Sequence, residues 1–136
     1  MHYTTLIVAV LVAAFSLSAF AAEESSSSAS KGEGKGTLYH VVTLKFKPDA
    51  KPEQIKAVEE AFVALKEKIP TITSLNWGTN VSPENHANGF THCFVLTFTS
   101  AKDRDAYLVD PAHKAFGKVL GPVMKDVMVI DFWAQK

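Results

Sequence analysis

The chain contains 136 residues, with 14 lysines and arginines, 14 aspartates and glutamates, and 47% hydrophobic residues. This length suits one folded domain with a modest core. The balanced charge, without any cluster of lysines or arginines, argues against a nucleic-acid partner, because nucleic-acid-binding proteins present a basic patch. Cys93 is the only cysteine, so an intramolecular disulfide is excluded.

The first 22 residues have the pattern of a secretory signal peptide. Leu6 to Ala22 is apolar and uncharged, and Ala19-Phe20-Ala21 places small residues where a signal peptidase cleaves. The run is short for a membrane-spanning helix, which needs about 20 residues. We therefore expect an exported protein, periplasmic or secreted, with no stable membrane span after cleavage. The alternative is a retained anchor, since no Lys or Arg precedes the apolar run.

Residues 23–36 (EESSSSASKGEGKG) are rich in serine and glycine and contain no large apolar side chain. Such a segment cannot bury enough apolar surface to offset the entropy lost on ordering. The composition therefore predicts a flexible linker over 23–36 and a folded domain over 37–136.

The spacing of apolar residues predicts the elements of this domain in chain order. They are a strand over Leu38–Phe46, a helix from Pro52 that ends before Pro70, a strand over Ile72–Val81, a strand over Phe90–Thr99, helical segments over Ala101–Val109 and Ala112–Lys125, and a strand over Val127–Trp133. The order β-α-β-β-α-β is the ferredoxin-like pattern. The predicted fold class is thus α+β, with an antiparallel four-stranded sheet.

Two of these strands begin with a histidine. His40 and His92 are each followed, on the same strand face, by three apolar residues: Val42, Leu44 and Phe46, and Phe94, Leu96 and Phe98. We expect the first and third strands to be parallel central neighbours, so that both histidines lie side by side between the sheet and the helices. Close imidazoles discourage mutual protonation, which leaves one of them a neutral candidate base. The alternative is two structural histidines at strand edges.

The segment from Tyr107 to His113 adds a phenol and a third imidazole near the break at Pro111. A tyrosine can polarise a carbonyl oxygen while a histidine removes a proton, so this pair is a candidate acid–base couple above the strand histidines. Two alternatives remain. Tyr107 packs on its helix while His113 lies in solvent, or three histidines hold a metal, although their spacing matches no compact ligand motif.

The segment Leu38–Trp133 resembles the stress-responsive A/B barrel (Dabb) family of dimeric α/β-barrel proteins. The resemblance rests on five motifs: His-Val-Val-x-Leu-Lys-Phe at 40–46, Trp77-Gly78 with Asn80-Val81-Ser82, Gly89-Phe90-Thr91-His92, Tyr107 with Pro111-Ala112-His113, and Val129-Ile130-Asp131-Phe132. It implies a homodimer in which two sheets face each other. The sheet face left uncovered by helices would carry Val41, Thr43, Cys93, Val95, Val127 and Val129, which is apolar enough for a subunit interface.

The chain is also similar to a polyketide cyclase of this family. That similarity implies His113 and Tyr107 as catalytic residues, His40 and His92 as ligand-binding residues, and an aldol-type cyclisation that needs no cofactor. One departure is Asp110, where the family often has a histidine; Asp110 would pair with His113 or make the site more acidic.

We therefore expect an exported Dabb homodimer whose apolar, His/Tyr-lined pocket binds a small hydrophobic organic molecule, with acid–base cyclase or lyase activity as a hypothesis. One alternative is a non-catalytic, stress-associated binding dimer. Another is a monooxygenase or haem-handling relative, in which haem would need an axial histidine. Family membership does not decide among these functions.

Overall fold

A computed structural model describes residues 36–136 of the chain. The predicted signal peptide and all but the last residue of the predicted linker lie outside the described residues, so both stay predictions. Within the described part, no helix is long and apolar enough to cross a lipid bilayer.

The elements follow the predicted β-α-β-β-α-β order. They are β1 (Leu38–Phe46), α1 (Pro52–Val63), α2 (Leu65–Lys68), β2 (Ser74–Thr79), β3 (His92–Phe98), α3 (Ala101–Val109), α4 (Pro111–Leu120) and β4 (Met124–Trp133). The bounds predicted for the first strand and for the 101–109 helix are confirmed. The predicted 112–125 helix was too long, because Gly121 and Pro122 follow Leu120 and proline cannot continue a helix.

Local hydrogen bonds explain where the helices begin. The Ser100 hydroxyl accepts the Asp103 amide proton at 3.0 Å, and the Asp110 carboxylate accepts the Ala112 amide proton at 2.7 Å. Each side chain thereby satisfies one of the free amides at a helix start. Asp110 and Pro111 separate α3 from α4, because Asp110 has extended backbone angles and Pro111 occupies the first position of the new helix.

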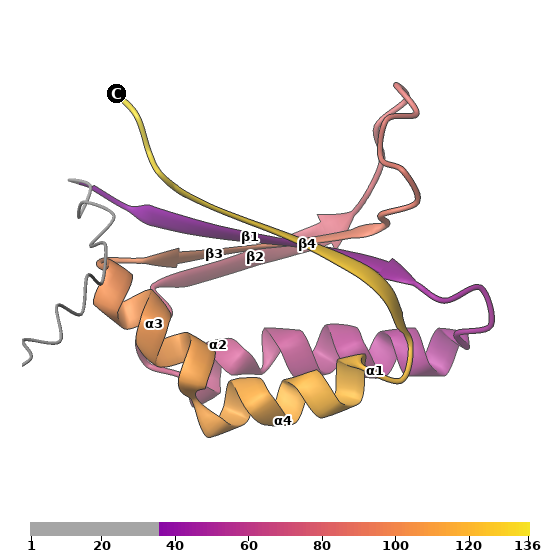
Figure 1. Ribbon diagram of the computed structural model, residues 1–136, viewed down its shortest axis with the longest axis horizontal. Helices are drawn as coiled ribbons and strands as arrows, with labels where there is room; N and C mark the ends of the chain where they lie inside the picture. The colour runs from indigo at the N-terminus through magenta and orange to yellow at the C-terminus, as the bar shows by residue number, and fades with distance from the viewer. Residues whose placement is uncertain (1–35) are drawn as a thin grey trace, which may run out of the picture.

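The four strands form one sheet in the order β2-β3-β1-β4, and every neighbouring pair is antiparallel. The helices cover one face of this sheet and leave the other open, as Figure 1 shows. The α+β ferredoxin-like fold with an antiparallel four-stranded sheet is thus confirmed.

The expectation that the first and third strands are parallel was wrong. The crossover through α1 and α2 makes β2 parallel to β1, and the loop over residues 80–91 then reverses the chain, so β3 runs against β1. His40 consequently lies opposite Leu96, and His92 lies opposite Leu44. The two histidines share a sheet face but lie four residues apart along it, roughly 13 Å at the rise of a strand.

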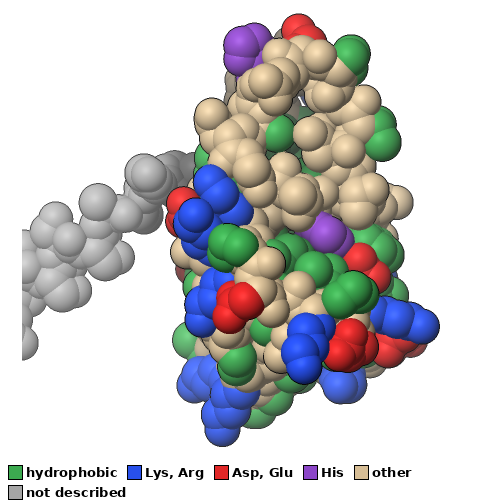
Figure 2. All heavy atoms as spheres, turned by 90° about the vertical axis from the view of Figure 1, so that its right-hand side faces the viewer, with side chains coloured by type: hydrophobic (Ala, Val, Ile, Leu, Met, Phe, Trp, Pro, Cys, Tyr) green, Lys and Arg blue, Asp and Glu red, His purple; other side chains and the backbone are tan. Residues whose placement is uncertain are grey.

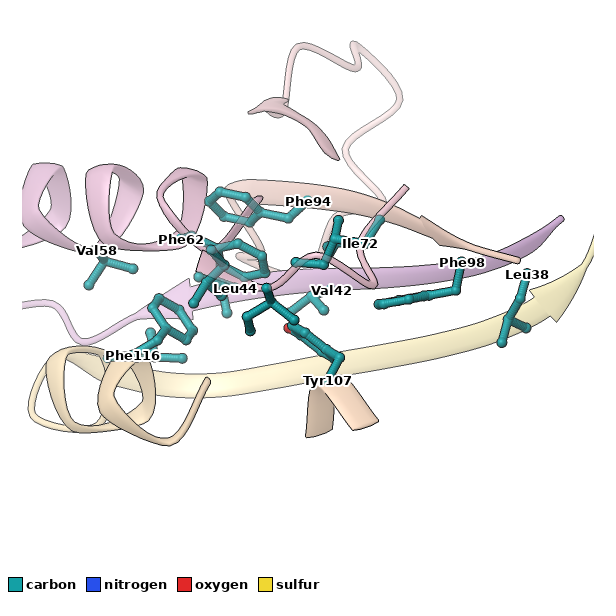
Figure 3. Packing of buried hydrophobic residues seen from close by; sticks show 14 of the residues in the cluster. Leu38, Val42, Leu44, Val58, Phe62, Ile72, Phe94, Phe98, Tyr107 and Phe116 are labelled. Atoms are coloured by element: carbon teal, nitrogen blue, oxygen red, sulfur yellow. The ribbon is translucent and has the colours of Figure 1, made fainter. Parts of the chain in front are cut away.

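The hydrophobic core fills the layer between the sheet and the helices (Figure 3). Phe62 of α1 stacks on Phe94 of β3 with ring centroids 3.9 Å apart, and Phe116 of α4 meets Phe62 edge-on at 4.7 Å. Tyr107 belongs to the same cluster, and its hydroxyl end points inward among Val42 and Leu44. These contacts fix α1, α3 and α4 over the sheet and so position the polar residues at its edges.

The uncovered sheet face differs from the predicted one in its β4 residues. Val127 and Val129 pair with Leu44 and Val42, so they lie on the helix side, and the prediction that they line the open face was wrong. A one-residue shift in register moves every side chain of a strand to the other face. The open face instead carries the three β4 residues that pair with Thr43, Val41 and Tyr39, namely Met128, Ile130 and Phe132.

Candidate functional site

His40 and Asp131 form the polar centre of the site. β1 places His40 on the helix-covered face with 4% of its surface exposed, and β4 places Asp131 directly opposite. Nδ1 of His40 lies 2.6 Å from Oδ1 of Asp131. Because an ionised carboxylate only accepts hydrogen bonds, Nδ1 of His40 donates. Nε2 is then the acceptor in the neutral form of the ring.

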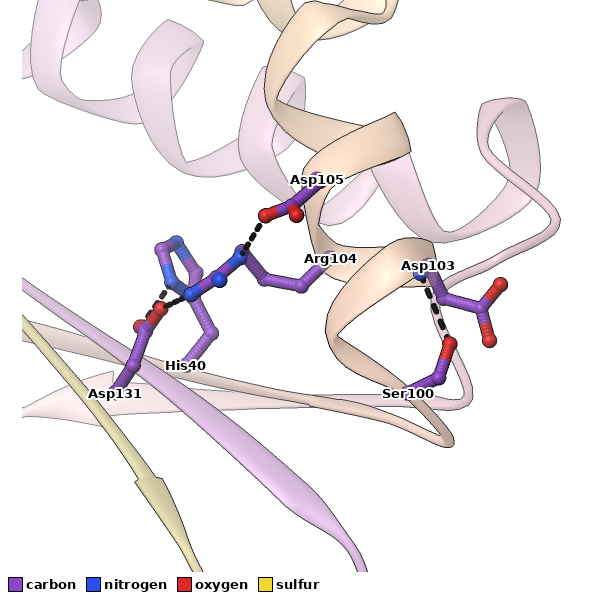
Figure 4. A network of polar contacts seen from close by, with 6 residues as sticks. All are labelled: His40, Ser100, Asp103, Arg104, Asp105 and Asp131. Atoms are coloured by element: carbon purple, nitrogen blue, oxygen red, sulfur yellow. Dashed lines mark hydrogen bonds and ion pairs between the residues drawn. The ribbon is translucent and has the colours of Figure 1, made fainter. Parts of the chain in front are cut away.

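Arg104 of α3 fixes the Asp131 carboxylate in this position. Its Nη1 donates to Oδ2 of Asp131, and its Nε donates to Oδ1 of Asp105 at 2.7 Å (Figure 4). Burial opposes the charge on Arg104, but the hydrogen bonds to Asp105 and Asp131 raise its pKa overall. The guanidinium therefore ties α3 to β4 and orients the acceptor of His40.

Tyr107 comes from the last turn of α3 and lies over His40. The two ring centroids are 5.4 Å apart in an edge-on arrangement, and the tyrosine is 1% exposed. Burial, with a smaller effect of the nearby Asp131 charge, raises the pKa of Tyr107 well above its ordinary value. The phenol thus stays protonated, so it can donate a hydrogen bond to a carbonyl oxygen but cannot serve as the base.

His113 comes from the first turn of α4, and its ring lies 4.4 Å from that of Tyr107. Nδ1 donates to the backbone carbonyl of Leu108 at 3.2 Å, so the neutral ring has Nε2 as its acceptor. Burial lowers the pKa of His113, and repulsion from the protonated form of His40 adds to this effect, while the Leu108 hydrogen bond and Asp110 oppose it. His113 is therefore predominantly neutral at pH 7, as a general base must be.

Asp110 does not pair with His113 through a hydrogen bond. Its carboxylate caps the start of α4, and its charge acts on His113 only by partly opposing the lowered pKa. The side chain at this position therefore has a structural role in placing the first turn that carries His113.

His92 belongs to a separate group at the other end of the sheet. Its Nε2 lies 2.9 Å from Oε1 of Glu59 in α1, and its Nδ1 lies 2.8 Å from the Thr91 hydroxyl. The Trp77 ring is nearly parallel to the His92 ring at 6.2 Å, and Phe46 meets that ring edge-on at 5.1 Å. Of the four predicted site residues, the structure brings His40, Tyr107 and His113 together and leaves His92 apart. The expectation that all four rings converge was wrong, since it rested on parallel strands.

Two hollows lie at the His92 end of the molecule. One of about 480 Å³ lies beside the loop between β2 and β3, and its lining includes Trp77, His86, Phe90, His92 and Cys93. The other, of about 430 Å³, is lined by Lys56, Glu59, Glu60, Val63, Ala64 and Trp77. Neither is lined by His40, Tyr107 or His113, whose rings pack against one another.

Among residues 36–136, no three histidine, cysteine or acidic side chains are grouped so that they could hold a metal ion.

Sequence reasoning missed three polar residues that hold the histidines. Asp131 and Arg104 orient His40, and Glu59 binds His92. The sequence does mark Asp131 as a candidate site residue, because it is an acidic residue within the apolar strand VMVIDFW. Arg104 and Glu59 gave none, because charged residues on helices usually lie in solvent.

Comparison with known proteins places the chain in a family. The model of the stress responsive A/B barrel domain (Dabb) matches residues 38–134, which is most of the chain. The protein therefore belongs to the stress-responsive A/B barrel family, as the sequence motifs predicted.

Individual relatives cover the same domain. The stress-response A/B barrel domain-containing protein HS1 of Arabidopsis thaliana is 34% identical over 100 residues, covering 74% of this chain and 92% of HS1. Olivetolic acid cyclase of Cannabis sativa is 30% identical over 97 residues, covering 71% and 96% of the two chains. Among solved structures, the hydroxynitrile lyase of Passiflora edulis aligns with a TM-score of 0.70 and 25% identity, over 76% of this chain and 97% of the lyase.

Several structural neighbours are dimers with a ferredoxin-like fold. One from Bacteroides fragilis aligns with a TM-score of 0.61 and 25% identity, over 73% of this chain and 97% of the neighbour. Another, from a Jannaschia species, aligns with a TM-score of 0.64 and 26% identity, over 73% and 100% of the two chains.

Proposed function

We propose that this chain binds a small hydrophobic organic molecule at His40, Tyr107 and His113 and catalyses an acid–base cyclisation or lyase reaction without a cofactor. The observation that carries the proposal is the contact chain from Asp131 through His40 and Tyr107 to His113. It combines a protonated phenol with two imidazoles whose Nε2 atoms can accept a proton. In the proposed reaction, Tyr107 donates a hydrogen bond to a carbonyl or hydroxyl oxygen of the substrate while His113 removes a proton.

The two named enzymes in the family suggest the reactions to assay. One relative is called a cyclase of olivetolic acid, and one structural neighbour is called a hydroxynitrile lyase. Both reactions can use a neutral base beside a hydrogen-bond donor and need no redox group. Because His92 and Glu59 lie at the other end of the sheet, we assign binding to His40 rather than to both strand histidines.

The test of catalysis is the release of cyanide from an aromatic hydroxynitrile, together with the formation of olivetolic acid. We expect His113→Ala to lower kcat/KM at least about 100-fold, because removal of a general base costs roughly two to four orders of magnitude. Tyr107→Phe should lower it through the loss of the hydrogen bond. His86→Ala is the matched control, since His86 lies in the exposed loop away from the site. Equal activity of His113→Ala and the unmodified chain would refute the catalytic role.

A second candidate is a non-catalytic binding dimer. The observation that favours it is the 1% exposure of Tyr107, since a ring packed this closely in the core leaves little room for a substrate. In that case the unmodified chain catalyses neither reaction faster than a His113→Ala, Tyr107→Phe double variant does. This comparison of rates distinguishes the two candidates.

Dimerisation through the open sheet face belongs to the same proposal. Met128, Ile130 and Phe132 are 44%, 50% and 45% exposed in the single chain, and an apolar area of this kind is typical of a subunit interface. Several structural neighbours are dimers with this fold.

Export is proposed from the apolar run Leu6–Ala22 alone. N-terminal sequencing of the protein isolated from its source should find a start just after Ala21 or Ala22.

A further inference from the structure

We infer that Trp77 and Glu59 form a second binding site, for a planar aromatic cation, at the opposite end of the sheet from Tyr107 and His113. It goes beyond the proposed function, because none of its residues belongs to the His40 cluster, which consists of His40, Asp131, Arg104, Tyr107 and His113.

The first support is an aromatic stack that ends at the molecular surface. Phe62 stacks on Phe94 at 3.9 Å, and Phe94 stacks on Trp77 at 5.4 Å with the planes 11° apart. Trp77 is the outermost ring, on the edge strand β2, and is 42% exposed. A further planar ring could continue this stack on the open side of the indole.

The second support is the hollow beside that ring. Its volume of about 430 Å³ lies within the range of small-molecule sites, roughly 300–1,000 Å³. Its other wall is one face of α1 and the residue after it, because Lys56, Glu59, Glu60, Val63 and Ala64 recur at spacings of three and four. Figure 2 looks at this end of the molecule and shows hydrophobic side chains gathered beside a histidine, with acidic and basic side chains around them.

The third support is the charge of the wall. Glu59 and Glu60 supply two carboxylates against the single ammonium of Lys56, and Lys56 pairs with Glu60 at 3.7 Å. Among residues 36–136, Glu59 pairs with His92 and with no lysine or arginine. A cation over the indole face would gain both the attraction of the ring and that of the Glu59 carboxylate.

Glu59 also links the site to His92. The Glu59 carboxylate accepts a hydrogen bond from Nε2 of His92. In the neutral form of the ring, Nδ1 then carries no proton and accepts a hydrogen bond from the Thr91 hydroxyl. A bound cation shares the Glu59 carboxylate, so it weakens this hydrogen bond. The ring signals of His92 should therefore report binding, while those of His113 should not change.

The experiment titrates the full chain with N-methylquinolinium and follows the fluorescence of Trp77 in a Trp133→Phe background. Tetramethylammonium supplies the charge without the ring, and naphthalenemethanol supplies the ring without the charge. We expect N-methylquinolinium to bind about two- to fivefold more tightly than naphthalenemethanol, since one exposed cation–π contact contributes about 0.5–1 kcal/mol. It should also bind more tightly than tetramethylammonium, which lacks the ring that stacks on the indole.

Two variants assign the site. Glu59→Gln should weaken N-methylquinolinium binding severalfold in the fluorescence titration, whereas Glu53→Gln, an exposed glutamate in the first turn of α1, should leave it unchanged. Trp77→Leu removes the fluorescent reporter, so its binding is followed through the His92 ring signals and should be weakened to a similar extent. NMR shifts of the His92 ring in the unmodified chain provide a readout that does not depend on the folding of a variant. The inference is overturned if the three probes bind equally, if none binds at millimolar concentration, or if His92 is unaffected by bound N-methylquinolinium. Activity at the Tyr107 site does not enter this test.

Discussion

At the scale of single residues, the same side chain type has different roles in different surroundings. His40 and His92 begin similar strands, yet Asp131 binds His40 through Nδ1 while Glu59 binds His92 through Nε2. The partner carboxylate decides which nitrogen carries the proton in each neutral ring. His40 thus presents Nε2 as an acceptor, and His92 presents Nδ1, which the Thr91 hydroxyl occupies.

The lowered pKa of His113 predicts how stability depends on pH. In the unfolded chain its pKa is near the ordinary value of 6.5, so between the lowered pKa and 6.5 the unfolded state binds more protons than the folded state. The free energy of unfolding should therefore fall as the pH drops through this window. Urea unfolding at a series of pH values should show this slope in the unmodified chain and a smaller slope in His113→Gln. Parallel curves would contradict the burial of His113.

At the scale of elements, the break between α3 and α4 places the two candidate catalytic rings. Tyr107 lies in the last turn of α3 and His113 in the first turn of α4, with extended Asp110 and helix-starting Pro111 between them. The chain turn brings the rings to 4.4 Å although they are six residues apart. A continuous helix would separate their directions, since six residues correspond to more than one and a half turns.

Asp110→Ala should destabilise the protein by about 1 kcal/mol, because it removes the hydrogen bond that caps α4. It should also lower the pKa of His113 further, since the Asp110 charge raises it. Thermal unfolding measures the first effect and NMR titration of the His113 ring the second. Lys118→Ala, on the exposed side of α4, is the control. An unchanged unfolding temperature in Asp110→Ala would show that the cap contributes little.

The elements of the fold were largely predictable from the sequence, and the site only in part. Apolar spacing and proline positions are local signals, and they gave the order of the strands and helices. Strand direction and register depend on how distant segments pair, so the relation of His40 to His92 and the face of Val129 were predicted wrongly. The partners Glu59 and Arg104 could not be found, because a charged helix residue gives no sign of a buried contact.

At the scale of the whole molecule, the sheet has one face covered by helices and one face without helices. The helix side holds the core, the His40 cluster at one end and the Trp77 hollow at the other, while the opposite side is open and apolar (Figure 1). The loop between β2 and β3 and the C-terminal residues both rise on the open side. A second copy that covered this face would leave the helix-side sites accessible.

Ile130→Asp should convert the proposed dimer to monomers, because it places a charge among the apolar side chains that β4 presents on the open face, where Ile130 pairs with Val41. Sedimentation velocity of the folded domain with and without the change measures the effect. Val119→Asp, which alters an exposed valine on α4, should leave the dimer intact. A monomeric unmodified chain would refute the proposed dimer, and a dimer lost only in Val119→Asp would place the interface elsewhere.

The decisive measurement is an NMR titration of the full chain with benzaldehyde, a small hydrophobic carbonyl compound, with the histidine ring signals assigned by His→Gln substitutions. If His40, Tyr107 and His113 form one binding unit, the signals of His40 and His113 shift together along one saturation curve, and those of His86 and His92 stay in place. Shifts confined to His92, or no shift up to the solubility of benzaldehyde, would contradict a ligand site at the three rings.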